Sequence, residues 1–495
     1  MSAAQQGAAG QSAGQQGAAW RYRHEGPRVD GKTLTRDRTF PVRYPHTGEP
    51  VADVAMATPD DVRQAVRVAA RFRDRLSRHD RYTILMRTRE LIDSRRAEWA
   101  RLITMESGLC LKDTGHEVGR ACDVLLFAAN QALVDDGEIY SCDLTAHGRA
   151  RKVFTTREPL LGVIGAITPF NHPLNQVVHK VAPAVATNNR LVLKPSEKTP
   201  LAALAFADVL YEAGLPPPMF QVVTGDPAEI GPALVEDPLV ELVTFTGGTE
   251  VGKRVAARAG YRRTIVELGG TDPAIVLDDA DLAETARLVL QGACKNSGQR
   301  CTAVKRILVQ AGVADEFVAL LTEQARQWRT GDPLDPRTDI GTVVDEPAAR
   351  RIEAAVDDAV RAGAVLRHGG VRSGAHYAPT VLDQVTPTMA VVTEEVFGPV
   401  APVVRFTTDD EAVRIANSSR YALSAGVFTR GLDRALRFVD QLHAGTVNIG
   451  EVPGYRIEST PFGGIKDSGL GYKEGVVETM KAYTNVKTFS LPWQP

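Results

Sequence analysis

Apolar and polar residues alternate with two different periods along this chain, and the change of period divides it into parts. From Thr58 to about residue 135 the apolar positions recur every three to four residues, which indicates helices. Thr58 is a suitable N-cap, and Pro59 suits the first turn of the helix that follows. Helical periodicity continues to Gly108 and returns in EVGRACDVLLFAANQALV. The next segment, GRARKVFTTREPL, is polar and extended, as expected for an arm that leaves the globule.

Short apolar strands alternate with helices in the segment that follows. LLGVIGAI, NRLVLK, MFQVV, VELVTF and RTIVEL indicate strands, and helical segments such as TPLAALAFADVLYEAG lie between them. Apolar strands separated by helices form a parallel sheet that is covered on both faces. A second alternation begins near residue 271. We therefore expect an α/β fold with two doubly wound parallel-sheet domains.

Composition limits the possible partners of this chain. A chain of 495 residues is too long for a single hydrophobic core, so two or more domains are expected. The 58 Lys and Arg residues nearly cancel the 60 Asp and Glu residues, which argues against a nucleic-acid surface. The apolar runs are too short to cross a membrane, so no membrane partner is expected.

The cysteines and the first residues indicate a cytoplasmic setting. Five scattered cysteines form neither a disulfide framework nor a zinc-ligand spacing, so no metal is expected. Residues 1–19 are rich in Gln, Gly and Ala and lack the apolar region of a signal peptide. We expect these residues to form a disordered tail.

The stretch NSGQRCTAVKR contains the best candidate nucleophile. Cys301 follows Arg300 in a polar segment that contains glycine. A nearby cation favours the thiolate, which is the nucleophilic form of cysteine.

Two turns after strands are candidate cofactor contacts. The loop Gly247–Gly252 can present free N–H groups to a phosphate, although a plain tight turn explains it as well. After another strand, Lys194 and Glu197 can bind a ribose, and a carboxylate there favours NAD over NADP. The alternative is a solvated helix start that is capped by Ser196.

Three motifs supply the groups that a cysteine needs to attack a carbonyl. Asn171 in PFNHP can donate to the developing oxyanion, and Glu267 in VELGG can activate water. Each motif by itself also has a simpler explanation, as a turn residue or as a charge at the end of a strand.

Together and in this order, the motifs resemble the aldehyde dehydrogenase superfamily. LKPSEKTPLAAL, FTGGTEVG, VELGGTDP, SGQRC, EEVFGP and PFGGIKDSG carry the resemblance, which runs from about residue 40 to the C-terminus. It implies an NAD-binding domain, a catalytic domain and a β-arm for oligomerisation, and therefore a homodimer or homotetramer. The implied ranges are 20–143 and 160–270 for the NAD-binding domain, 271–477 for the catalytic domain, and 144–159 and 478–495 for the arm.

The resemblance also implies roles for individual residues. Cys301 would form a thiohemiacetal and then a thioester, which water activated by Glu267 hydrolyses. Gly248 stands where many members have serine, and Thr271 stands where asparagine or lysine is frequent. The implied cofactor contacts are Thr168, Phe170, Lys194, Ser196, Glu197, Gly247, Gly248, Thr249, Gly252, Leu268, Glu395 and Phe397.

Arg300 points to an anionic substrate, because many family members have an apolar or small residue before the cysteine. The stretch SGQRCTAVKR resembles members that oxidise phosphorylated or phosphonylated aldehydes, which implies oxidation of phosphonoacetaldehyde to phosphonoacetate. An ion pair or thiol activation would also explain Arg300, and a backbone-bonded loop histidine would explain His172. The candidate substrate-binding residues are Arg120, His172, Arg300, Thr302 and Arg456.

Other functions remain open at this point. Phosphonoformaldehyde, glyceraldehyde 3-phosphate or another small anionic aldehyde would need the same chemistry. A CoA-acylating enzyme is disfavoured because Glu267 is present to deliver water, and a catalytically silent binding protein is disfavoured because all three chemical residues are present.

Overall fold

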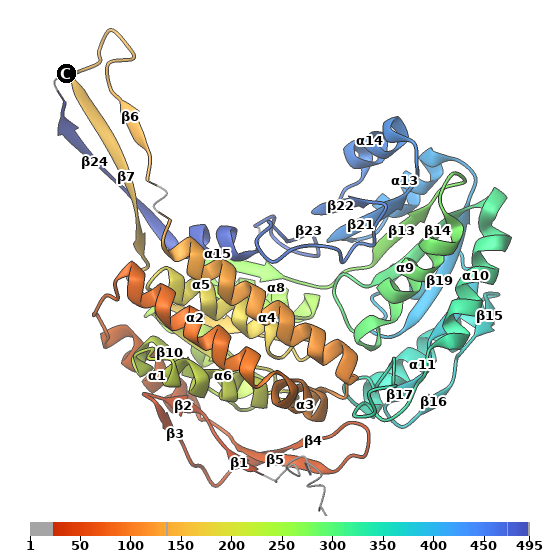
Figure 1. Cartoon of the computed structure of the whole chain (residues 1–495), viewed down its shortest axis with the longest axis horizontal. Helices are drawn as coiled ribbons and strands as arrows, with labels where there is room; N and C mark the ends of the chain where they lie inside the picture. Colours follow the sequence, from red (N-terminus) through yellow and green to blue (C-terminus); the bar gives the residue numbers. More distant parts are fainter. Residues whose placement is uncertain (1–22, 135–136, 473, 494–495) are drawn as a thin grey trace, which may run out of the picture.

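Two seven-stranded sheets, each with flanking helices, and a projecting arm form most of the described part of the chain (Figure 1). The computed structural model describes residues 23–134, 137–472 and 474–493. The predicted tail, residues 1–19, lies outside this part. The α/β fold with two largely parallel sheets is confirmed. Among the described residues, no helix is long and apolar enough to cross a membrane.

The first sheet has the strand order β12-β11-β8-β9-β10-β2-β3. The strands from β12 to β10 are parallel, and β2 and β3 extend the sheet in antiparallel fashion. The chain leaves β8 for β9 on one side and reaches β11 on the other. A crevice therefore opens beside the carboxyl end of β8, where ligands bind in such sheets. The strands are β2 (Arg28–Val29), β3 (Lys32–Thr33), β8 (Val163–Ile167), β9 (Leu191–Lys194), β10 (Phe220–Val222), β11 (Val240–Thr246) and β12 (Arg263–Glu267).

Helices cover both faces of the first sheet. Thr58 caps α1 through a capping box with Asp61, as the sequence predicts for Thr58. The helical stretch that was predicted to continue to Gly108 is interrupted at Arg95, which separates α2 from α3. The helices are α1 (Pro59–Arg71), α2 (Arg78–Ser94), α3 (Arg96–Ser107), α4 (Leu111–Ala132), α5 (Asn175–Ala186), α6 (Leu201–Glu212), α7 (Pro227–Val235), α8 (Thr249–Ala259) and α15 (Val476–Ala482).

Helix α5 was not predicted, and its burial explains why. Every one of its residues is buried, between the first sheet and α4, so it has no polar face to reveal a helical period. Lys180 and His179 are its charged or titratable members, and both are paired with carboxylates.

The second sheet has the order β15-β18-β19-β14-β13-β21-β22 and is parallel except for β15. Because β12 ends at Glu267 and β13 begins at Asp272, only a short segment joins the two sheets. The strands are β13 (Asp272–Val276), β14 (Val304–Gln310), β15 (Val365–His368), β18 (Thr380–Asp383), β19 (Val400–Phe406), β21 (Ser424–Phe428) and β22 (Thr446–Ile449). The helices are α9 (Leu282–Cys294), α10 (Ala314–Gln327), α11 (Glu346–Arg361), α12 (Ala390–Thr393), α13 (Asp409–Asn417) and α14 (Leu432–Gln441).

The arm is an antiparallel sheet that projects away from both larger sheets (Figure 1). It contains β6 (Ile139–Ser141), β7 (Arg151–Pro159) and β24 (Thr484–Pro492). Residues 478–482, which were assigned to the arm, belong instead to α15, which packs against α5. The role of the arm in oligomerisation stays a prediction.

Small sheets complete the described part of the fold. One contains β1, β5 and β4 near the start of the chain, and two are pairs of short strands. The strands are β1 (Arg23–Glu25), β4 (Thr39–Arg43), β5 (Pro50–Ala55), β16 (Arg372–Ser373), β17 (His376–Tyr377), β20 (Tyr421–Ala422) and β23 (Ile465–Lys466).

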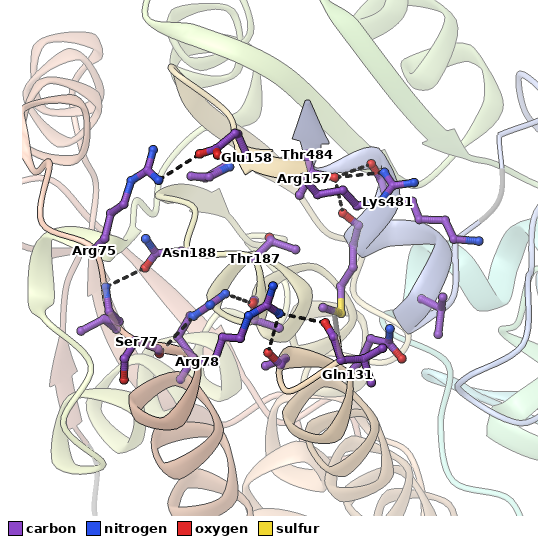
Figure 2. A pocket seen from close by; sticks show the side chains of 18 residues that line it. Arg75, Ser77, Arg78, Gln131, Arg157, Glu158, Thr187, Asn188, Lys481 and Thr484 are labelled. Carbon is purple, nitrogen blue, oxygen red and sulfur yellow. Dashed lines mark hydrogen bonds and ion pairs between the residues drawn. The ribbon is translucent and has the colours of Figure 1, made fainter. Parts of the chain in front are cut away.

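A cavity of about 380 Å³ lies where the arm joins the first sheet and its helices (Figure 2). Arginines that line this cavity bond to the arm and to the ends of the neighbouring helices. Arg75 pairs with Glu158 of β7 at 2.9 Å. Arg78 donates to two carbonyls at the end of α4, and Arg81 donates to the Ala186 carbonyl at the end of α5. Cations at these ends offset the negative pole of each helix.

The segment before Cys301 crosses another backbone segment at close range. Gly298 has φ +70°, and a Cβ there would lie 2.0 Å from the carbonyl oxygen of Gly398. We expect Gly298→Ala to lower the free energy of unfolding by about 2–4 kcal/mol through overpacking and left-handed strain. Urea denaturation measures the change. Gly312→Ala is the matched control, since Gly312 has open space around its Cβ position. Equal stability of the two variants would contradict this account.

Candidate active site

The three residues predicted to do chemistry line one cavity of about 140 Å³. Asn171 follows β8, Glu267 ends β12, and Cys301 lies between α9 and β14. The cavity lies at the carboxyl ends of the strands beside β8, which is the crevice expected from the strand order. Three distant segments of sequence therefore meet at one site.

The backbone of the cysteine loop is held by side chains from several elements. Asn296 and Ser297 have positive φ, so this turn needs outside support. The Asn296 N–H donates to Asp113 of α4 at 2.8 Å. The Asn171 amide donates to the Gln299 carbonyl, also at 2.8 Å. These bonds fix the position of the residues that follow, including Cys301.

Cys301 and Glu267 influence each other's protonation. Burial raises the pKa of the Cys301 thiol well above its usual range, and the Glu267 carboxylate adds to this, while Arg456 opposes it. Burial, with a smaller effect of Glu474, raises the pKa of Glu267 to about 8, although the Cys301 thiol favours its ionised form. Neither oxygen of Glu267 has a hydrogen-bonding geometry with another described residue. The carboxyl is therefore available to exchange a proton at this site.

Two residues near Glu267 were not predicted. Lys180 of α5 forms a buried ion pair with Glu474 at 2.9 Å, and both groups act on the pKa of Glu267. A lysine in the apolar segment VVHKVAPAVA is a signal that could have identified Lys180.

The predicted phosphate loop has the features that a dinucleotide needs. Gly248 is the N-cap of α8, and no side chain occupies this helix N-terminus. Open space surrounds the Cβ position of Gly248, so the N–H groups can approach an anion. A Cβ on Gly252 would lie 2.2 Å from Leu268, so glycine permits close packing of α8 against this residue. Gly247 and Gly248 line the cavity together with Leu268.

Glu395 and Phe397, two of the cofactor contacts implied by the resemblance, also line this cavity. Glu395 accepts a hydrogen bond from the Gly270 N–H at 3.1 Å. Phe397 packs edge-on against Phe170, with ring centroids 5.9 Å apart. Glu395, Phe397 and Phe170 all line the cavity. Thr249 accepts a hydrogen bond from the Gly269 N–H at 3.3 Å.

The predicted ribose residues follow β9. Lys194 is buried and lies 3.8 Å from Glu197, whose side chain is 39% exposed. Ser196 accepts from the Lys198 N–H, but it caps no helix, because α6 begins only at Leu201 with Pro200 as its N-cap; the alternative of a capped helix start is therefore wrong. Thr168 is buried, and its hydroxyl has no partner among the described residues. Lys194 and Glu197 are therefore placed together, and Glu197 is accessible to a ligand.

The substrate candidates form a cationic cluster that does not line the 140 Å³ cavity. The pKa of His172 is held well below its usual range by burial and by Arg120, Arg300 and Arg456. The three arginines therefore act on one buried histidine. Thr302 lies beside the same group, since a Cβ on Gly454 would meet both Thr302 and Arg300.

Arg300 is anchored rather than mobile. One of its terminal nitrogens, Nη2, donates to the Gly292 carbonyl at 2.6 Å near the end of α9. The side chain of His172 is also fixed, because its Nε2 accepts from the Asn296 amide at 2.8 Å. These contacts differ from the alternatives raised. Among the described residues, Arg300 donates to backbone carbonyls rather than to a carboxylate, and the His172 ring bonds to a side-chain amide rather than to the backbone.

Further residues of the cluster were missed. Burial, Lys295 and Arg120 together lower the pKa of His116 to about 4, so His116 and Lys295 belong to the cluster. Glu458 supplies a carboxylate to Arg120 at 2.5 Å. The described residues contain no group of ligands that could hold a metal ion.

The chain matches known proteins over nearly its whole length. Residues 33–489 match the model of the aldehyde dehydrogenase family. A 3-sulfolactaldehyde dehydrogenase of Priestia aryabhattai is 39% identical over 94% of this chain and 97% of its own length. The structure of an NAD-dependent aldehyde dehydrogenase from Sinorhizobium meliloti has a TM-score of 0.91, with 34% identity and 96% coverage of both chains. An NADP-dependent glyceraldehyde-3-phosphate dehydrogenase from Bacillus halodurans C-125, complexed with NADP, has a TM-score of 0.91, with 36% identity and coverage of 95% and 99%.

The raised pKa of Glu267, about 8, gives the site a testable pH dependence. A general base must be ionised, so the steady-state rate of thioester hydrolysis should rise about tenfold from pH 7 to pH 9 as Glu267 loses its proton. Glu267→Gln should give a burst of about one reduced nicotinamide per site and then slow turnover that does not follow this pH profile. Stopped-flow absorbance measures both phases.

Cys301→Ala is the control for the burst, because it removes the nucleophile and should give neither phase. If wild type and Glu267→Gln share one steady rate and one pH profile, Glu267 is not the base.

Proposed function

This chain belongs to the aldehyde dehydrogenase family, and from that premise we propose that it oxidises a small aldehyde with an anionic head group, using NAD. Phosphonoacetaldehyde, oxidised to phosphonoacetate, is the substrate that we place first, because the motifs around Cys301 resemble phosphonoacetaldehyde dehydrogenase. Phosphonoformaldehyde, glyceraldehyde 3-phosphate and 3-sulfolactaldehyde are the alternatives.

The observation that carries this proposal is the convergence of Arg120, Arg300 and Arg456 on the buried His172. Guanidinium groups that lie near one another repel, and a bound anion would offset this repulsion and accept their hydrogen bonds. A phosphonate or phosphate head group has up to two negative charges and tetrahedral oxygens that several fixed donors can bind.

The relatives support the same class of substrate. By their names, one acts on a sulfonated aldehyde and one on a phosphorylated aldehyde. Both aldehydes are small and anionic, but their head groups differ. The relative found at 39% identity is named for sulfolactaldehyde, so the phosphonate rests on the resemblance of the motifs alone.

The chemistry follows from the three residues at the cavity. Glu267 takes the proton of Cys301, and the thiolate adds to the aldehyde carbon to give a thiohemiacetal. The Asn171 amide and the Cys301 N–H stabilise the developing oxyanion. NAD, when bound, accepts the hydride that leaves this carbon. Glu267 next releases to solvent the proton that it took from Cys301 and accepts one from water, which attacks the thioester. The carboxylic acid leaves, and Glu267 returns its proton to the Cys301 thiolate.

The roles of Arg300 and Arg456 can be separated by experiment. Arg456 is the cation that favours the Cys301 thiolate, whereas Arg300 is anchored at the end of α9. With phosphonoacetaldehyde, both Arg300→Leu and Arg456→Leu should lose about 10- to 150-fold in kcat/KM, since each removes a bond to a charged group. With acetaldehyde, Arg456→Leu should also lose activity and Arg300→Leu should lose little. Steady-state kinetics on the two aldehydes gives the result.

Arg351→Leu on α11 is the control for removing an arginine, because it lies on a helix beside the second sheet and outside this cluster. Equal losses of Arg300→Leu on both aldehydes would exclude a head-group contact for Arg300.

The exposed carboxylate of Glu197 is the basis for choosing NAD. It lies beside Lys194, where it would accept bonds from a ribose diol and repel a 2′-phosphate. We therefore expect kcat/KM to be higher with NAD than with NADP, and Glu197→Ser to narrow the difference. Kinetics with both cofactors at one aldehyde concentration tests this. A wild-type preference for NADP would contradict the assignment.

A further inference from the structure

Glu458 joins three side chains that come from different segments. Its Oε1 accepts a hydrogen bond from the Arg120 Nε at 2.5 Å, and its Oε2 accepts one from the His179 Nε2 at 2.5 Å. The Arg456 Nη2 lies 3.9 Å from the same Oε2. The Glu458 side chain is only 5% exposed. One buried carboxylate therefore connects α4, α5 and the loop that carries Arg456.

Arg120 and Arg456 are each fixed by a neighbouring side chain, and their guanidinium groups keep N–H donors for a ligand. Arg120 uses its Nε for Glu458, and its terminal nitrogens form no hydrogen bond with another described residue. The Arg456 guanidinium lies over the Phe462 ring, 3.9 Å from its centroid. Both side chains are partly accessible, at 22% and 16% exposure. Glu458 and Phe462 thus fix the two guanidiniums and leave their outer N–H groups for an anion.

The charge on Glu458 is permanent in this setting. Although burial opposes ionisation, His179, Arg120 and Arg456 hold the pKa of Glu458 far below its usual range. Burial lowers the pKa of His179, and the charge and hydrogen bond of Glu458 oppose this effect. The carboxylate offsets the repulsion between two guanidiniums that would otherwise separate.

We propose that Glu458 is a positioning residue that fixes Arg120 and Arg456 at the spacing required by a tetrahedral oxyanion head group. It acts through the two arginines and sets the preference of the site for anionic aldehydes over neutral ones. This inference rests on the proposed function.

If Glu458 served only to balance charge, its variants would change anion binding in the opposite direction. If the carboxylate were only a counter-charge, it would compete with the substrate anion. Removing its charge would then tighten anion binding, and shortening the side chain with the charge kept would change little. If Glu458 positions the arginines, both changes weaken anion binding.

The test compares Glu458→Gln, which keeps the shape and removes the charge, with Glu458→Asp, which keeps the charge and shortens the reach. Glu451→Gln is the matched control, because this glutamate lies in the same loop and bonds only to its neighbour, the Val452 N–H. KM and kcat are measured with phosphonoacetaldehyde and with acetaldehyde. Calorimetry gives the Kd of phosphonoacetate as a readout that does not depend on turnover.

Both Glu458 variants should raise the KM for phosphonoacetaldehyde and the Kd of phosphonoacetate by about 10-fold or more, the effect of losing one bond to a charged group. Their kcat/KM for acetaldehyde should fall by a smaller factor than that for phosphonoacetaldehyde, because a displaced Arg456 still carries its charge near Cys301, and Glu451→Gln should match wild type throughout. Circular dichroism checks that each variant folds. If Glu458→Gln does not fold, the result with Glu458→Asp tests the proposal.

Wild-type behaviour of Glu458→Asp, or tighter phosphonoacetate binding by Glu458→Gln, would overturn the inference in favour of a counter-charge. Equal losses on both aldehydes would overturn it in favour of a general structural role. A wild-type enzyme that oxidises acetaldehyde as well as it does the anionic aldehydes would instead reject the proposed function, whatever the variants do.

Discussion

The hydrogen bond from the Asn171 amide to the Gln299 carbonyl is the contact on which the site depends. It joins the end of β8, in the first sheet, to the loop that carries Cys301 before β14 of the second. That loop contains consecutive residues with positive φ and cannot hold its shape alone. Asp113 and Lys305 add further bonds to the same loop. The predicted nucleophile is thus placed by a contact between the two parts of the chain that contain the large sheets, and Asn171, the predicted oxyanion donor, is part of that contact.

Buried charge near Cys301 is arranged in two groups, and Arg456 acts on the carboxylate of each. On one side, Glu267 is near Glu474 and Lys180, and its pKa is raised so that it can gain and lose a proton during turnover. On the other side, Glu458 is kept ionised by His179 and the arginines. The two carboxylates are both buried, but their neighbours push their pKa values in opposite directions. The first is suited to proton transfer and the second to holding cations in place.

Arginine has two distinct uses in this structure. In the cavity at the base of the arm, Arg78 and Arg81 neutralise the ends of α4 and α5, and Arg75 ties the helices to β7 (Figure 2). Near Cys301, Arg300 is also tied to a helix end, yet it lies in a group of like charges around His172. Accumulation of arginines alone therefore does not identify an anion site. What distinguishes the second group is that Arg120 and Arg456 keep outer N–H groups for a ligand.

Much of the fold was determined by the sequence alone, because apolar strands that alternate with amphipathic helices form parallel sheets. The same reasoning failed for α5, where complete burial removes the polar face that reveals a helix. Motif order predicted the roles of Cys301, Glu267 and Asn171, since each chemical role needs a particular side chain after a strand or in a loop, and the structure brings the three to one cavity. Which charged groups surround these three residues was decided only by the tertiary structure. Glu474 and Glu458 lie far from these residues in sequence, and Lys180 lies on the unpredicted helix α5, so only the folded structure shows that their charges come within reach of the site.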